Sequence, residues 1–199
     1  MTALCWRDWA SGVVADLRRM LRMDEREEPP GLAPQPRGPK DYLDLAKSPS
    51  ATEEQLRWLA GSTYSFVVTA VAQHAATPSD VLEQLVPSNA KSWNEQSLLL
   101  ALAEHPASSS QVLASIARQV PRLLHERDAQ PGFAAGIALF RRPDTSDELL
   151  LELLEDPDVT TEFRKVAARE TVHDGIREKL LDDRSETVRR TAERRRADA

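Results

Sequence analysis

The sequence predicts an all-α protein, and three observations support this prediction. The chain of 199 residues contains 26 Ala and 25 Leu against 3 Ile and 13 Val. Unbranched side chains lose little rotamer freedom in a helix, so this balance favours helices over strands. Apolar residues recur mostly at steps of three and four, as they do along one face of a helix. The third observation is that one pattern of such residues returns along the chain, which indicates a row of similar helical units.

Residues 1–23 predict a separate amphipathic helix. Between Leu4 and Leu21 the apolar residues fall on one stripe, and most charged residues lie outside it. Trp6 and Trp9 lie one turn apart on this stripe and form a large apolar surface that needs a partner. We expect this face to dock on the first helical repeat. Another protein is the second expectation, and a lipid surface is the least favoured.

The segment of residues 24–40 predicts a linker. It contains five prolines and two glycines, a composition that opposes helix formation and cannot bury a core. We therefore expect the repeat domain to occupy residues 41–199.

The repeated pattern has five copies after Asp41. Each copy opens with an apolar pair, continues through a turn that often contains Pro, and ends with apolar residues three or four positions apart. The opening residues are Leu45, Val71, Leu102, Leu139 and Val166, and a sixth half-copy starts near Asp183. Each copy predicts two helices, because proline ends the first and a hydroxyl can accept the free N–H groups of the second. The prolines are Pro49, Pro106 and Pro143, and the hydroxyl residues are Thr52, Thr77 or Ser79, Ser109 and Ser146.

Two stretches of the repeated region resemble known repeat families. The run from Val71 to Leu85, together with Leu102–Pro106, resembles the variant leucine-rich repeat, and Asp156–Ala168 is similar to a HEAT repeat. The resemblance covers residues 41–192 and implies an α-solenoid, a superhelix of about five two-helix repeats. The chain departs from these families by irregular spacing and by an insertion around Val120–Pro131. It also lacks the cysteine cluster that holds an iron–sulfur centre in some variant-repeat proteins, so no cofactor is expected.

The charge of the chain is unevenly distributed. The formal net charge of −6 divides into +2 for residues 1–23, −11 for residues 24–162 and +3 for residues 163–199. An acidic body disfavours general binding of polyanions, because phosphate contacts need Lys and Arg. A nucleic-acid role would therefore need the C-terminal arginines, which we instead expect to form the exposed face of a capping helix. These are Arg189, Arg190, Arg194, Arg195 and Arg196.

Catalytic and metal-binding patterns are absent from the sequence. Cys5 is the only cysteine, so the chain can form neither an internal disulfide nor a four-thiolate metal site. His125 precedes Glu126, but Ala129 stands where a zinc-protease helix needs its second His. No glycine-rich phosphate loop and no nucleophile elbow occur.

Two further groups of polar residues have structural explanations. His74 and His105 occupy one position in successive copies, where Arg142 and Arg169 stand in the fourth and fifth. A cation there is stabilised by the dipole and free carbonyls at a helix C-terminus. The eight acids between Asp144 and Glu162 are expected to form a solvated helix face. The alternative is a docking patch for a basic partner.

These observations predict a non-catalytic scaffold or adaptor that binds another protein through a helical surface. The candidate anchors are Trp6, Trp9, Trp58 and Trp93, because tryptophan often dominates interface energy. For Trp58 or Trp93 taken alone, a buried role is the favoured expectation. Arg57, Gln73 and Asn94 are further candidates. The alternative is a HEAT-like protein that binds nucleic acid. A cytoplasmic location is expected, since no secretory segment and no run of about 18 apolar residues occurs.

Overall fold

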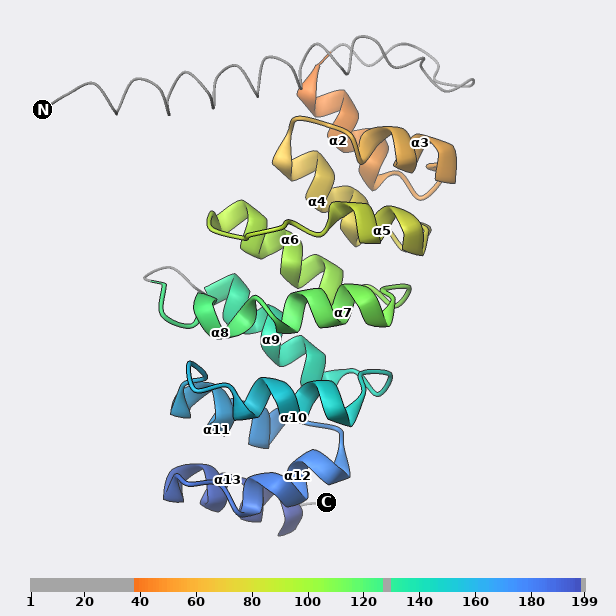
Figure 1. Cartoon of the computed structure of the whole chain (residues 1–199). Coiled ribbons are helices and arrows are strands. Elements are labelled where there is room, and N and C mark those ends of the chain that lie inside the picture. Colours follow the sequence, from red (N-terminus) through yellow and green to blue (C-terminus); the bar gives the residue numbers. More distant parts are fainter. Residues whose placement is uncertain (1–37, 127–129, 198–199) are drawn as a thin grey trace, which may run out of the picture. The chain divides into compact units, whose positions relative to one another are not determined.

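The computed structural model describes residues 38–126 and 130–197, and all regular elements in this part of the chain are helices (Figure 1). The all-α prediction is therefore confirmed for these residues. The expected N-terminal helix, with Trp6 and Trp9, lies outside the described residues, as does most of the expected linker. None of the described helices is long and apolar enough to cross a membrane.

The chain divides into two compact units, the first ending at Thr77 and the second beginning at Pro78. This boundary lies inside the second copy of the predicted pattern. The two units are called unit 1 and unit 2 and are described separately.

Unit 1 contains three described helices. These are α2 (Pro39–Lys47), α3 (Glu53–Leu59) and α4 (Ser65–Gln73). Pro39 occupies the first turn of α2, so the predicted linker is two residues too long. Proline is tolerated there because the first N–H groups of a helix have no partner within the helix and the fixed φ of proline suits it.

The helices of unit 1 pack against one another around a small apolar core. Leu56, Leu59, Val67 and Val71 are completely buried in it. Helix α3 begins with the predicted cap, because the Thr52 hydroxyl accepts the N–H of Gln55 at 3.3 Å. The Gln55 side chain accepts the N–H of Thr52 at 2.9 Å in return, which completes a capping box.

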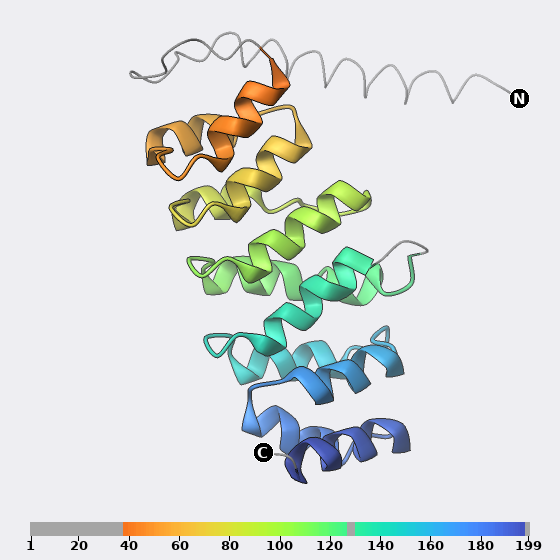
Figure 2. The ribbon, with the colours of Figure 1, turned by 180° about the vertical axis from the view of Figure 1, so that it is seen from behind.

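Unit 2 contains the remaining helices in two rows. One row consists of α6, α9, α11 and α13, and the other of α5, α7, α10 and α12 (Figures 1 and 2). Within each row every helix packs on the next, and the short helix α8 lies against α7 and α9. The bounds are Ser79–Leu85 for α5, Trp93–Glu104 for α6, Ser110–Ala117 for α7, Val120–Leu123 for α8, Gln130–Arg141 for α9, Asp147–Glu155 for α10, Thr161–Glu170 for α11, Asp174–Leu181 for α12 and Glu186–Ala197 for α13.

Two of the hydroxyl caps predicted for unit 2 are present, and one is not. Ser109 and Ser146 accept the N–H groups of Val112 and Leu149 at the starts of α7 and α10. Helix α5 instead begins after Pro78 without a side-chain cap. The expectation of a cap from Thr77 or Ser79 is therefore wrong. The Thr77 hydroxyl donates to the carbonyl of Val71 at 2.6 Å, so it closes the end of α4 instead.

The predicted insertion contains helix α8, which packs closely on α9 because α9 carries two glycines. A Cβ atom on Gly132 would lie 2.9 Å from the Leu123 side chain. One on Gly136 would lie 2.7 Å from the ring of Phe163 and 2.8 Å from the side chain of Val120. The insertion is therefore a packed part of the core at its α8 end.

Candidate functional site

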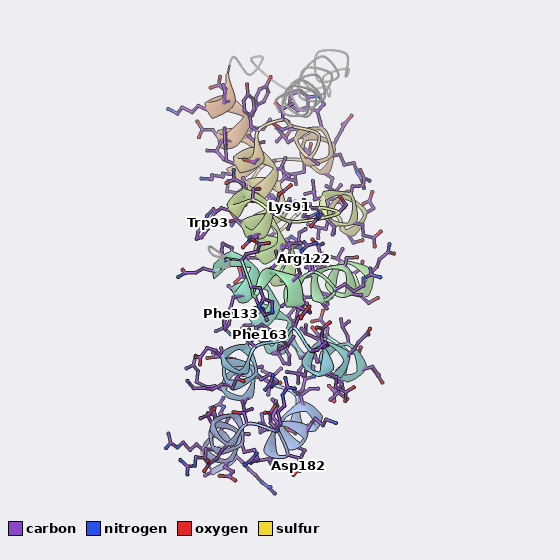
Figure 3. All side chains as sticks on the ribbon, turned by 60° about the vertical axis from the view of Figure 1, so that its left-hand side comes forward. Lys91, Trp93, Arg122, Phe133, Phe163 and Asp182 are labelled. Carbon is purple, nitrogen blue, oxygen red and sulfur yellow. The ribbon has the colours of Figure 1, made fainter. Side chains whose placement is uncertain are left out.

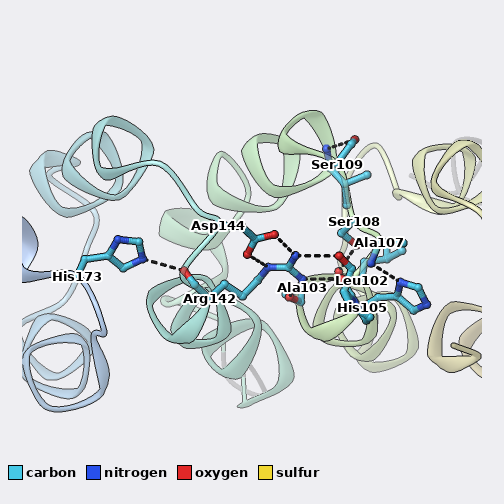
Figure 4. A network of polar contacts seen from close by, with 11 residues as sticks. Leu102, Ala103, His105, Ala107, Ser108, Ser109, Arg142, Asp144 and His173 are labelled. Atoms are coloured by element: carbon cyan, nitrogen blue, oxygen red, sulfur yellow. Dashed lines mark hydrogen bonds and ion pairs between the residues drawn. The ribbon is translucent and has the colours of Figure 1, made fainter.

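The turns that follow α6, α9 and α11 are joined by a polar network (Figure 4). Arg142 donates from Nη1 to the carbonyls of Ala103 at 3.1 Å and His105 at 2.5 Å. In the turn after α11, the Nε2 atom of His173 lies 2.8 Å from the carbonyl of Arg142 in the turn after α9. Asp144 forms an ion pair with Arg142 at 2.6 Å, and this hydrogen-bonded guanidinium lowers the pKa of the Asp144 carboxyl.

Unit 1 contains a matching contact. The Nε2 atom of His74 lies 2.9 Å from the carbonyl of Ser48, at the end of α2. The Nδ1 atom of His74 accepts the N–H of Ala76, and Nδ1 of His105 accepts the N–H of Ala107 in the same way. Because a nitrogen that accepts is unprotonated, Nε2 carries the proton in the neutral ring of His74 and donates to Ser48.

One residue of the repeated basic position is not part of this network. Arg169 lies in the last turn of α11, as predicted, but it pairs with Glu170 at 2.8 Å. His173, rather than Arg169, contacts the preceding turn at the carbonyl of Arg142. Its Nδ1 atom also lies 2.7 Å from the Asp147 carboxylate. The network occupies carbonyls that a helix end leaves without partners, which is a structural role. No group of three or more His, Cys, Asp or Glu in the described part of the chain could hold a metal ion.

The two described tryptophans of the predicted set differ in exposure. Trp58 is only 9% exposed and packs on Tyr42 with ring centroids 5.5 Å apart, so it belongs to the core of unit 1 and presents no anchor. Trp93 is 54% exposed at the start of α6. Arg57, Gln73 and Asn94 are also exposed.

Trp93 begins a stripe along α6 that faces away from the core. We call Trp93, Ser97, Leu100 and Glu104 the α6 stripe, since their spacing of four, three and four places them on one side of a helix. The members are exposed or half-buried, whereas neighbouring Leu99 is completely buried. The α6 stripe thus combines an exposed aromatic ring, a half-buried leucine and two polar residues.

The C-terminal arginines are divided between structural contacts and solvent. Arg189 donates to the carbonyl of Asp183 at 2.6 Å, and Arg190 pairs with Glu186 at 2.6 Å. The remaining three are exposed and form no ion pair with any residue that the structure describes; they are Arg194, Arg195 and Arg196. Helix α13 buries only Val188 and Ala192 against α11 and α12, which fits the expected capping helix.

The acidic residues of α10 also lie as expected. Glu148, Glu152 and Glu155 are exposed, while Leu150 and Leu153 face the core. Glu155 pairs with Lys179 of α12 at 3.3 Å. The face is therefore solvated and partly neutralised by the neighbouring helix.

A groove in unit 2 was not predicted from the sequence. It has a volume of about 530 Å³ and lies between the loop that joins α5 to α6 and the helices α7 and α8. The lining residues are Val86, Pro87, Ser88, Ser115, Arg118, Gln119 and Arg122. We call it the arginine groove, because Arg118 and Arg122 are its charged residues. The insertion around Val120 was the signal available in the sequence, but no motif connects residues 86–88 with Arg118 and Arg122.

A second cavity, of about 230 Å³, is lined in part by Arg164 and Asp183, which form an ion pair. This pair is 2.9 Å long, and both side chains are more than nine-tenths buried. Arg164 also donates to the carbonyl of Val159 at 2.8 Å. These partners occupy the guanidinium, so Arg164 holds α11 to the loop before α13.

In comparisons with known proteins, the chain matched no family model, no curated protein and no solved structure.

Proposed function

We propose that the chain is a non-catalytic scaffold or adaptor that binds another protein through the surface of a helical repeat array. The proposed array is an α-solenoid of five two-helix repeats, in which α13 caps the last repeat. Consecutive units in such an array pack on their neighbours and leave long exposed faces for recognition.

The contacts within unit 2 support the array. Each row of helices is continuous, and the same kind of contact joins successive turns through Arg142 and His173. The apolar residues aligned in the sequence support it too, because Leu102, Leu113 and Leu150 are all nearly or completely buried. Repeated residues at repeated structural positions are what stacked units require.

The observation that carries the binding function is the exposure of Trp93. A tryptophan ring buries about 150–250 Å² when it is covered, and such residues are enriched among those that dominate interface energy. Trp93 leaves 54% of its surface in solvent, and half-buried Leu100 follows it on the α6 stripe. A partner that covers the α6 stripe would remove this apolar surface from water.

Site-specific photo-crosslinking in the native cell tests this function. A photo-reactive phenylalanine analogue at position 93 should yield an adduct with one defined protein. Position 172 is the matched control, because Val172 is also apolar and 50% exposed but lies between α11 and α12. With the identified protein in purified form, Trp93→Ala should weaken binding by about tenfold or more, and Val172→Ala should not. Equal adducts at the two positions would contradict the proposal.

Nucleic-acid binding is the second candidate, and it is favoured by the three arginines of α13 that form no ion pair with a described residue. Phosphate contacts would come from Arg194, Arg195 and Arg196, and the complex would weaken steeply with added salt. The scaffold proposal predicts no mobility shift of duplex DNA or RNA at low salt. A shift that disappears when these three arginines become Gln would support the second candidate instead.

A further inference from the structure

We infer that the arginine groove is a binding site for an acidic peptide segment of a protein partner. This inference rests on the proposed scaffold function and adds the chemistry of a second contact surface. It is carried by the shape of the groove, by the rigidity of its wall and by its two unpaired cations.

The groove is held open by a side chain that joins its two walls. Gln119 of the α7–α8 junction accepts the N–H of Ala90 at 2.9 Å and donates to the carbonyl of Pro87 at 2.9 Å. The α5–α6 loop is therefore tied at two backbone positions to the end of α7. Because the loop is already ordered, a ligand binds without the entropic cost of ordering it.

The two arginines of the groove are available to an anion. Arg118 donates from Nη2 to the Ser115 hydroxyl at 3.1 Å, and both guanidinium groups are exposed. Neither forms an ion pair with any residue in the described ranges. A planar guanidinium can bind a carboxylate through two parallel hydrogen bonds, so adjacent acidic side chains are matching ligands.

The surroundings direct an acidic ligand to one side of Arg118. Glu152 and Asp156 of the α10 region line a smaller groove of about 120 Å³ that shares Arg118. They would repel an anion there, so the favourable side is the one that contains Arg122. Lys91 lies on the α5–α6 loop, above Arg122 in the view of Figure 3, and its charge acts on the neighbouring Glu95.

Arg122 lies in the insertion that interrupts the regular spacing of the repeats. Arg122 belongs to α8, which the insertion contributes and which the other copies lack. Insertions in repeat proteins lie on one face, which is often the binding face. The insertion thus supplies both a packed helix and one of the two cations.

A short acidic segment fits this site better than a nucleic acid does. The chain carries a net charge of −6, and residues 24–162 carry −11. A long polyanion would extend from the groove toward Glu152 and Asp156 on the other side of Arg118, whereas a short peptide can end within the groove.

The experiment is a fluorescence-anisotropy titration of the full chain with a short fluorescein-labelled oligoglutamate peptide at low ionic strength. The labelled oligoglutamine peptide and a longer oligothymidylate, which would extend beyond the groove, are the comparison probes. We expect binding of oligoglutamate in preference to both. Arg118→Gln with Arg122→Gln should weaken it by about tenfold or more, and Gln119→Ala should weaken it by a smaller factor.

The matched control is Arg194→Gln with Arg195→Gln, which changes the net charge equally but lies on α13. This variant should bind oligoglutamate within about twofold of the parent chain. Equal losses in the two double variants, preference for oligothymidylate, or no binding by the parent chain would each overturn the inference. Thermal unfolding of every variant shows whether it is folded. Failure here leaves the crosslink at Trp93 unaffected, so the two proposals can fail separately.

Discussion

Helices α9 and α13 have the same length, but α9 is mostly buried and α13 is mostly exposed. Each has 12 residues, but α9 buries eight of them and α13 buries two. Helix α9 packs on α6, α7, α8 and α11. Among the described helices, α13 packs extensively only on α11 and α12. The difference shows that buried residues are concentrated at α9, and that α13 is mostly polar and exposed.

The largest effect is expected from Phe163→Ala, which removes the ring that α9 packs against. The ring of Phe163 is completely buried, with centroids 5.3 Å from Phe133 and 5.9 Å from Phe140. Its loss should lower the free energy of unfolding by about 3–5 kcal/mol, because a cavity remains. Urea unfolding followed by circular dichroism measures this change. Phe66→Ala is the control, because that ring is 46% exposed; an equal loss there would contradict the comparison.

The next effect is expected from Gly136→Ala in α9. Alanine is the better helix former by about 1 kcal/mol, which would stabilise an open helix. At this position the added Cβ meets Phe163 at 2.7 Å and Val120 at 2.8 Å. Overpacking of this kind costs about 1–3 kcal/mol, so a net loss of stability is expected. A rise in the unfolding midpoint would show that the packing between α8, α9 and α11 is looser than these two distances indicate.

A smaller, pH-dependent effect is expected at the turn after α9. The pKa of Asp144 is lowered below its ordinary value of 3.8 by its hydrogen bond to Arg142. The pair therefore stabilises the fold above pH 3.8 and loses this contribution as the pH falls through the lowered value. Because the Asp144 side chain is 54% exposed, the contribution should stay below about 1 kcal/mol. Asp144→Asn should destabilise the protein at neutral pH and match the parent chain in acid; a constant difference would argue against the ion pair.

The smallest effect on stability is expected in α13. Arg194→Gln with Arg195→Gln changes exposed residues that contact no acid in the described part of the chain. The free energy of unfolding should change by no more than about 0.5 kcal/mol. Urea unfolding at low and high salt provides the measurement. A larger loss that salt removes would indicate that α13 contributes more to unit 2 than its two buried residues suggest.

Local chemistry made part of the fold predictable. Thr52, Ser109 and Ser146 could be identified as caps because a cap needs only its own side chain and the next N–H groups. Burial was the favoured role for Trp58 taken alone, but the residue that covers it could not be predicted, since the ring of Tyr42 comes from another helix. The place of His173 in the turn network was missed because the end of α11 shifts the register of the repeat.

The candidate sites were predictable only where one helix forms them. Trp93 was singled out from the sequence, although its exposure was known only from the structure. The arginine groove was not predicted, because its walls are brought together by contacts of Gln119 with residues about 30 positions away.

The sequence by itself determined that this chain forms short helices, where α3, α7 and α10 begin, and that its charge is acidic in the middle and basic at the end. These properties arise from neighbouring residues, through caps, helix periodicity and composition. Only the tertiary structure decided that Trp58 is buried and Trp93 exposed, that α8 packs on glycines of α9, and that Arg118 and Arg122 share a groove. Such outcomes depend on which helices meet, and that is settled by packing between residues distant in the chain.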